Sequence, residues 1–318
     1  MTPIYAFAHF AVDLGCAYGA FSAFHGGAKG FLLYNFFAFA LQMPLGLLAD
    51  RWNRNRLLAT LGTLLVAVLC CFPAFGLGGI CLLGLGNAMF HIGGGLEVLN
   101  LSGDRAAPLG VFVSPGAFGI FLGTLWGKSA FSPLWVLLPL LTAALLMVSV
   151  RLPVPQNPPQ ELPKSTVIPC AAVLFLVVIL RSVVGIQGSF PWKTGLWSWV
   201  AVAAVVLGKS LGGILSDHFG SRFTALLSLG LGALFFLFGD FPLCGTLALL
   251  LFNMTMPITL HALTRRMPGS KGFSFGLLTF ALFLGFLPAY FGAASMGMAA
   301  MASASLLSLV LLLPALGK

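Results

Sequence analysis

The sequence predicts an all-α membrane protein of twelve transmembrane helices, arranged as two similar six-helix bundles. Three observations lead to this fold class. Of 318 residues, 59% are hydrophobic and only 7% are charged, whereas a soluble domain carries about 25% charged residues. The apolar residues form runs long enough to span a bilayer, and a glycine–aspartate motif occurs once in each half of the chain. The composition excludes a soluble enzyme, a secreted domain and a disordered chain.

Twelve apolar runs have the length that a membrane-spanning helix needs, roughly 20 residues at about 1.5 Å rise each. The connections between them are short, and glycine and proline occur both at their ends and inside them, as transmembrane helices tolerate. The runs comprise residues 3–24, 30–48, 57–75, 78–102, 108–127, 131–150, 166–187, 194–216, 222–239, 242–264, 273–292 and 295–315.

The net charge of +9 has a topological explanation. With the N-terminus inside, the outer loops hold only Lys29, Lys128 and Lys193, and the inner loops hold the larger share of basic residues, as the positive-inside rule requires. The inner residues are Arg51, Arg54, Arg56, Arg105, Arg151, Lys164, Arg222, Arg265, Arg266, Lys271 and Lys318. We therefore expect a multi-pass protein of a bacterial inner membrane, with both termini cytoplasmic and no nucleic-acid partner.

The sequence contains no recognisable catalytic or cofactor motif. Its six cysteines lie in or beside apolar runs, without the spacing of a zinc site or a disulfide framework. The motifs of zinc proteases, serine hydrolases and phosphate-binding loops are missing from the sequence. We expect free thiols, no enzyme activity, no cofactor and no metal.

A proline-rich segment, residues 152–165, lies at the middle of the chain. Segments of this composition behave as semi-rigid extended spacers. Six predicted spans precede it and six follow. The sequence therefore predicts an N-terminal bundle over residues 1–151, a cytoplasmic linker over 152–165 and a C-terminal bundle over 166–318.

A repeated motif supports this division. Gly46 and Asp50 in GLLADRWNRNR match Gly213 and Asp217 in GILSDHFGSRF at a common offset of 167 residues. The glycine permits close approach of a second helix, and the aspartate can accept hydrogen bonds from the N-terminus of a neighbouring helix. Basic residues follow each aspartate and are expected to anchor the turn at the inner leaflet: Arg51, Arg54 and Arg222.

With this motif, the span count and the central linker, the chain resembles the major facilitator superfamily. The hallmark of that family is G-x-x-x-D-R-x-G-R-[RK] between spans two and three, with a weaker copy between spans eight and nine. The first copy here has Asn53 in place of the second glycine and Asn55 at the last basic position. The second copy keeps that glycine as Gly220 but has His218 in place of the arginine. The arginine motif of the family's fourth span is missing.

A closer resemblance is to the fosmidomycin-resistance branch of that family. Its first span carries H-x-x-x-D, as His9 and Asp13 do, and its fourth span carries an F-H-P-x-G-like stretch, similar to NAMFHIGGG with Ile92 in place of the proline. Its fifth span has spaced glycines ending in Gly-Pro. The corresponding glycines are Gly116, Gly119, Gly123 and Gly127, with Thr124 where that proline would be. The resemblance implies a monomeric, proton-coupled exporter of small organic compounds.

Ionisable side chains inside the predicted spans are functional candidates, because an unpaired charge in hydrocarbon is costly. In the fold that the resemblance implies, spans one, four, seven and ten line the central cavity. We expect substrate binding and proton coupling at His9, Asp13, His91, Glu97, Arg181 and His261, which lie on those four spans, and at Lys209 on span eight.

His9 and Asp13 are four residues apart and therefore share one helix face, where they can hold a proton together or simply pack against a neighbour. With the repeat offset of 167 residues, Arg181 corresponds to position 14 in the first half, one residue from Asp13. The arginine fork fits a carboxylate or a phosphonate, so it either binds an anionic solute or forms a permanent pair with Asp13 or Glu97. His91, His261 and Lys209 have packing or snorkelling roles as their alternatives.

These observations predict a secondary active transporter that moves a small anionic or zwitterionic organic solute by alternating access, in proton-coupled export. Its partners are the solute, protons and the lipid bilayer. Two alternatives stay open: an uptake carrier for an anionic metabolite, and a non-transporting membrane receptor with the same fold.

Overall fold

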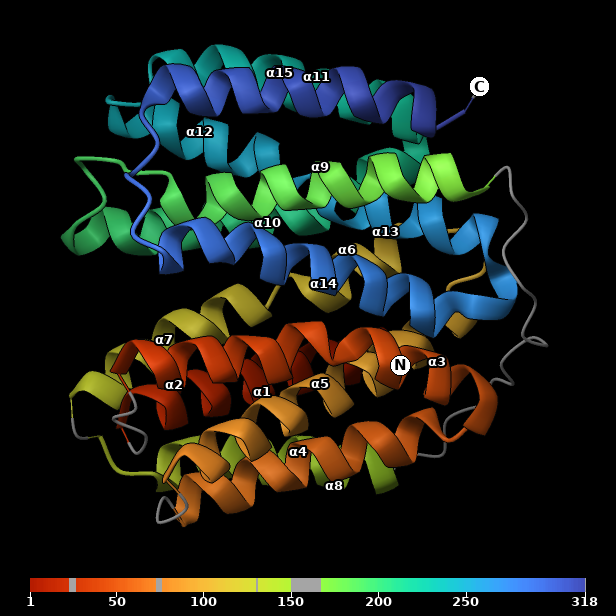
Figure 1. Cartoon of the computed structure of the whole chain (residues 1–318), viewed down its shortest axis with the longest axis vertical. Helices are drawn as coiled ribbons and strands as arrows, with labels where there is room; N and C mark the ends of the chain where they lie inside the picture. The colour runs from red at the N-terminus through yellow and green to blue at the C-terminus, as the bar shows by residue number, and fades with distance from the viewer. Residues whose placement is uncertain (23–26, 73–75, 130, 150–166, 318) are drawn as a thin grey trace. The chain divides into compact units, whose positions relative to one another are not determined.

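Helices account for the apolar runs, because a backbone in hydrocarbon must satisfy its own N–H and C=O groups (Figure 1). The computed structural model describes residues 1–22, 27–72, 76–129, 131–149 and 167–317. The first part of the chain forms α1 (Thr2–Ser22), α2 (Gly27–Asn35), the π-helical turn η1 (Phe36–Ala40), α3 (Gln42–Trp52), α4 (Asn55–Cys71), α5 (Gly76–Leu101), α6 (Ala107–Val113), α7 (Gly116–Lys128) and α8 (Leu134–Ser149). The second part forms α9 (Val167–Gln187), α10 (Gly195–Phe219), α11 (Ser221–Leu237), α12 (Pro242–Asn253), α13 (Thr255–Arg266), the short η3 (Pro268–Ser270), α14 (Lys271–Tyr290) and α15 (Met298–Ala315).

These helices confirm the predicted all-α class. In the part of the chain that the structure describes, nine helical segments are long and apolar enough to cross a membrane. Three shorter apolar helices, α4, α8 and α11, supply the remaining predicted spans. The predicted linker, residues 152–165, lies outside the described residues, so the division of the chain at that segment stays a prediction.

The Cα positions group the chain into two compact units. Unit 1 comprises Met1–Gly103, Pro115–Glu161 and Pro268–Phe280, and unit 2 comprises Asp104–Ser114, Leu162–Met267 and Ala281–Lys318. Each unit thus contains most of one predicted half and one helical segment from the other: α6 belongs to unit 2, and the first part of α14 belongs to unit 1.

A row of glycines brings α7 against α1 in unit 1 (Figure 1). A Cβ atom built on Gly123 would overlap the backbone carbonyl of Leu14 and lie 2.9 Å from the Ala17 Cβ. Helices gain little hydrophobic free energy by associating in lipid, so close backbone packing through small residues holds them together. The glycines that would meet α1 in this way are Gly116, Gly119, Gly123 and Gly127.

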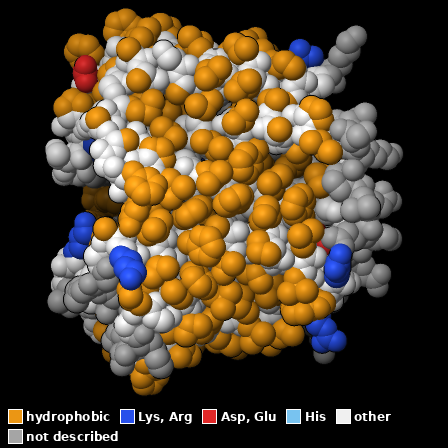
Figure 2. Space-filling model, in the orientation of Figure 1, with side chains coloured by type: hydrophobic (Ala, Val, Ile, Leu, Met, Phe, Trp, Pro, Cys, Tyr) orange, Lys and Arg blue, Asp and Glu red, His pale blue; other side chains and the backbone are white. Residues whose placement is uncertain are grey.

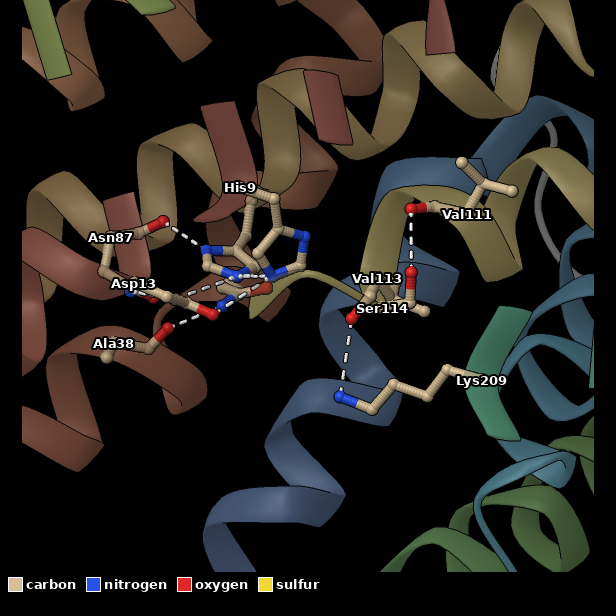
Figure 3. Close-up of polar contacts among 10 residues, drawn as sticks. His9, Asp13, Ala38, Asn87, Val111, Val113, Ser114 and Lys209 are labelled. Carbon is tan, nitrogen blue, oxygen red and sulfur yellow. Dashed lines mark hydrogen bonds and ion pairs between the residues drawn. The ribbon is translucent and has the colours of Figure 1, made fainter. Parts of the chain in front are cut away.

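Three predicted spans are interrupted at a proline, which lacks the N–H that continues a helix. The fifth span breaks between α6 and α7 at Pro115, leaving carbonyls without helical partners. The Ser114 hydroxyl donates to the Val111 carbonyl at 3.2 Å, and the Lys209 ammonium donates to the Val113 carbonyl at 3.4 Å (Figure 3). The break is therefore repaired by side chains of unit 2.

The second and tenth spans are interrupted in the same way. Before Pro44 the chain forms the wider turn η1, and the Gln42 amide donates to the Ala38 carbonyl at 2.6 Å. Before Pro257 the chain ends α12 and restarts as α13, and the Thr255 hydroxyl donates to the Phe252 carbonyl at 3.0 Å. Continuous spans were expected at both places, and proline is the physical reason for the difference.

The first copy of the repeated motif fixes the start of α14 in unit 1. The Asp50 carboxylate accepts hydrogen bonds from the backbone N–H of Gly272 at 2.7 Å and of Phe273 at 2.9 Å. A Cβ on Gly46 would overlap the Gly272 carbonyl. The aspartate thus satisfies N–H groups that have no helical partner, and the glycine permits the approach.

The second copy makes the equivalent contact in unit 2. The Asp217 carboxylate accepts hydrogen bonds from the N–H of Ala106 at 2.7 Å and of Ala107 at 2.9 Å, at the start of α6. A Cβ on Gly213 would lie 2.6 Å from the Ala106 carbonyl. The internal repeat therefore extends from sequence to geometry: each aspartate caps the helix that the other half supplies to its unit.

The basic residues of the motif lie at the surface. Arg51, Arg54 and Arg222 are exposed, and the Arg222 guanidinium donates to the Gly317 carbonyl at 3.0 Å. On the face shown in Figure 2, hydrophobic side chains cover most of the surface, while the visible Lys and Arg side chains lie toward its margins. Such a surface suits lipid contact, and Leu145 is 64% exposed without any polar cover.

Enlarging a glycine between α1 and α7 should destabilise the protein. We expect Gly123→Val to lower the free energy of unfolding by about 1–3 kcal/mol, because the valine would force the two backbones apart. Thermal unfolding in detergent measures the change. Gly230→Val on α11 is the matched control, since a Cβ there meets nothing within 4 Å. Equal losses in the two variants would contradict close packing at Gly123.

Removing the Asp50 carboxylate should loosen the start of α14. We expect Asp50→Ala to speed amide hydrogen exchange at Gly272 and Phe273 by about tenfold or more, because hydrogen bonds to a charged acceptor contribute about 1.5–3 kcal/mol. Hydrogen–deuterium exchange with peptide mass analysis gives the measurement, and the exposed Asp240→Ala is the control. Unchanged exchange at these two amides would show that the carboxylate does not hold the helix start.

Candidate functional site

Three ionisable side chains converge inside unit 1, from the middle of α1 and of α5 (Figure 3). His9 Nε2 lies 3.2 Å from Asp13 Oδ2 and 3.0 Å from His91 Nε2, and His91 Nε2 lies 3.7 Å from Asp13 Oδ1. The three residues are only 5%, 7% and 8% exposed. The helical spacing predicted the shared face of His9 and Asp13, and the packing of α5 on α1 adds His91. We call these three residues the His–Asp–His cluster.

Asn87 orients two members of the cluster. It lies one helical turn before His91, whose Nδ1 is 2.9 Å from the Asn87 backbone carbonyl. A carbonyl can only accept, so Nδ1 carries a proton, and in the neutral ring Nε2 then presents its lone pair to His9 and Asp13. The Asn87 side-chain amide donates to Asp13 Oδ1 at 3.3 Å (Figure 3).

The break in the fifth span brings a helix N-terminus to the cluster. Gly116 is the first residue of α7, and a Cβ built on it would overlap Asp13 Oδ2 and lie 2.6 Å from His9 Nε2. The first residue of α7 therefore lies in direct contact with the Asp13 carboxylate and the His9 imidazole. Only glycine leaves the carboxylate and the imidazole their present positions.

The cluster has the chemistry to hold a cation. Two imidazole nitrogens and a carboxylate can share a proton through short hydrogen bonds. Their ligand atoms also lie within 4.8 Å of one another, close enough to coordinate a metal ion together. The sequence predicted the proton role and not the metal one, because the histidines come from helices 82 residues apart in the chain.

Arg181 lies on α9 in unit 2. Its guanidinium donates to the Thr259 hydroxyl on α13 at 3.2 Å, and it forms no ion pair with a carboxylate of the described residues. Arginine has five N–H donors, so a single neutral acceptor leaves most of them for another group. Asp13 belongs to unit 1, so the expected approach of Arg181 to Asp13 across the two halves stays a prediction.

Glu97 and Lys209 contact backbone ends. The Glu97 carboxylate lies beside Arg56, whose backbone N–H is in the first turn of α4. Lys209 donates to the carbonyl of Val113, at the end of α6. Both contacts compensate unsatisfied helix-terminal groups, which gives these two charges a structural explanation.

His261 lies on α13 in unit 2, away from any cluster of ligating side chains in the described residues. Its neighbours are the backbone of Asp104 and the charged side chains of Asp217 and Arg265. Asp104 and Arg265 form an exposed ion pair at 3.7 Å. His261 therefore belongs to the surroundings of the second repeated motif.

Sequence reasoning did not select Asn87, Gly116 or Thr259 as site residues. Asn87 has a signal in the sequence, because a polar residue one turn before His91 in an apolar span shares its helix face. Gly116 is recognisable only together with the break at Pro115. Thr259 has no comparable signal, since its contact with Arg181 depends on how α9 and α13 pack.

Comparisons with known proteins give similarity in structure only. The sequence matches no protein-family model and no curated protein. The structure is similar to the E. coli fucose:proton symporter FucP, with 12% identity, a TM-score of 0.66 and coverage of 98% of this chain and 97% of that chain. It is also similar to a bacterial homologue of the iron transporter ferroportin, solved with soaked iron, with 15% identity, a TM-score of 0.61 and 100% coverage of both chains.

A second FucP structure matches with the same identity, coverage and TM-score. It shows this major facilitator superfamily transporter in the outward conformation. The matched proteins are transporters rather than enzymes. The apolar helices make this chain an integral, multi-pass membrane protein. Its fold is that of the major facilitator superfamily transporters.

Proposed function

We propose that the chain is a secondary active transporter that moves a small organic solute, anionic or zwitterionic, by alternating access and proton-coupled export. The observation that carries this proposal is the His–Asp–His cluster. Three buried ionisable groups in the middle of membrane-spanning helices are costly, and they persist where an ion must bind within the membrane. In this chain the three groups lie within hydrogen-bonding distance or ion-pair distance of one another.

Proton coupling follows from the contacts inside the cluster. His9 and His91 face each other through their Nε2 atoms at 3.0 Å, a distance that requires a hydrogen between the two nitrogens. Asp13 Oδ2 lies 3.2 Å from His9 Nε2, so a carboxylate and two imidazoles are close enough to share one proton. FucP, which has the same fold, is a fucose:proton symporter, and this supports proton chemistry here.

The solute class follows from Arg181. Its guanidinium keeps its charge throughout a transport cycle, and its planar fork fits a carboxylate or a phosphonate. The guanidinium donates a hydrogen bond to the neutral Thr259 hydroxyl. A half-buried cation with a neutral partner favours an anionic group on the solute.

Alternating access is supported by the repeated motif. Asp50 and Asp217 each hold a helix N-terminus by two hydrogen bonds, at equivalent places in the two halves of the sequence. Such contacts form and break as units, because both bonds end on a single carboxylate. A matched pair of contacts, one in each unit, is consistent with two repeats that exchange roles in alternating access.

Asp13→Asn should abolish proton-driven transport and preserve exchange of solute. We expect the current under a proton gradient to fall by tenfold or more, on the order of what one essential charge contributes. Currents on reconstituted membranes, under a panel of anionic, zwitterionic and cationic compounds, measure the coupled step. Counterflow of labelled solute measures exchange, and Asp240→Asn is the control for a surface charge.

Arg181→Lys should weaken the apparent affinity for anionic solutes by about tenfold or more, because it replaces a bidentate fork by a point charge. Currents for cationic compounds serve as the internal comparison. Unchanged transport in both the Asp13 and the Arg181 variants would refute the site assignment. A folded protein that gives neither current nor counterflow would favour the receptor function instead.

A further inference from the structure

We propose that the His–Asp–His cluster is also a binding site for a divalent transition-metal ion such as Zn²⁺ or Co²⁺. This inference goes beyond the transport of an organic solute and does not depend on it. It concerns the three ligand atoms His9 Nε2, His91 Nε2 and one carboxylate oxygen of Asp13.

The spacing of these atoms matches the edges of a coordination polyhedron. Metal–nitrogen bonds of about 2.0–2.1 Å place neighbouring ligand atoms roughly 3.0 Å apart at octahedral angles and roughly 3.3 Å apart at tetrahedral angles. The two Nε2 atoms are 3.0 Å apart, Asp13 Oδ2 lies 3.2 Å from His9 Nε2, and Asp13 Oδ1 lies 3.7 Å from His91 Nε2. One ligand atom from each residue lies within 4.8 Å of the other two, so an ion can bind all three after the side chains rotate around it.

The surrounding contacts prepare the ligands for a metal. A metal-binding histidine usually donates its other ring N–H to a carbonyl or a carboxylate, which directs the free lone pair toward the ion. His91 does this, with its Nδ1 at 2.9 Å from the Asn87 carbonyl. The Asn87 amide donates to Asp13 Oδ1 at 3.3 Å, which leaves Oδ2, the oxygen nearer His9, for the ion.

The set of ligands is of the open kind. Two imidazoles and one carboxylate supply three positions, so water or a solute group completes the coordination. The mixture of nitrogen and oxygen donors suits zinc, cobalt, nickel and iron better than calcium or magnesium, which prefer all-oxygen sites. Gly116 lies against Asp13 Oδ2 and His9 Nε2. Because glycine has no side chain, the space beside Asp13 Oδ2 that a Cβ would occupy is left open.

The test is Co²⁺ binding to the full chain in detergent, purified without a polyhistidine tag. We expect one Co²⁺ per chain by equilibrium dialysis, together with visible absorption bands that nitrogen ligation produces. His9→Gln and His91→Gln should each weaken binding by about tenfold or more, as loss of a ligand does. His261→Gln is the matched control, since this buried histidine in unit 2 belongs to no ligating cluster of the described residues.

Size-exclusion chromatography first establishes that each variant is folded and monodisperse. If a ligand variant is not folded and monodisperse, Asn87→Ala is tested in its place. This variant keeps all three ligands and removes the side-chain amide that donates to Asp13. Equal Co²⁺ binding by the wild type, His91→Gln and His261→Gln would overturn the proposal, as would a wild type that binds none. The assay needs no transport, so a chain that binds Co²⁺ but carries no solute refutes only the proposed function.

Discussion

Hydrocarbon offers no hydrogen bonds, and the need to satisfy every backbone polar group from within the protein governs this structure. The constraint explains why the apolar runs are helical, and it is most informative where a helix is interrupted. At Pro115 the freed carbonyls receive the Ser114 hydroxyl and the Lys209 ammonium. At the second span the Gln42 amide bonds back to Ala38. Polar side chains in these spans therefore often serve to satisfy backbone groups, and that role must be considered before a functional one is inferred.

The same solvent removes the hydrophobic drive between helices, so their packing depends on close backbone contact. The glycines of α7 bring it against α1, and the first of them, Gly116, lies directly on the Asp13 carboxylate and the His9 imidazole. The packing of α7 against α1 thus also positions the start of α7 at the His–Asp–His cluster. A side chain at Gly116 would displace the two groups that we propose bind a cation, so the proposed site depends on the same glycines that pack α7 against α1.

The fold was predictable from the sequence because its main determinants are local. Composition and run length indicate spanning helices, and the offset of 167 residues between Asp50 and Asp217 indicates the repeat. The interruptions were less predictable, since proline is tolerated inside many transmembrane helices and the outcome depends on neighbours such as Lys209. Within the site, His9 and Asp13 are one turn apart on one helix, but the arrival of His91 depends on tertiary packing. The metal-compatible geometry follows from that packing alone, so no spacing rule could reveal it.

The ionisable groups of the spans separate by what they contact. Asp50 and Asp217 accept from helix N-termini, Glu97 accepts from the start of α4, and Lys209 donates to the end of α6. Each of these charges compensates a backbone end, and its position is explained by that contact. The members of the His–Asp–His cluster contact one another and Asn87, and Arg181 bonds to a hydroxyl. Placing these four ionisable groups inside the fold adds little to its stability, since replacing buried ionic groups by apolar ones often stabilises a protein. We propose that they instead bind a cation in unit 1 and an anion in unit 2, and this is the physical basis of the transport function proposed above.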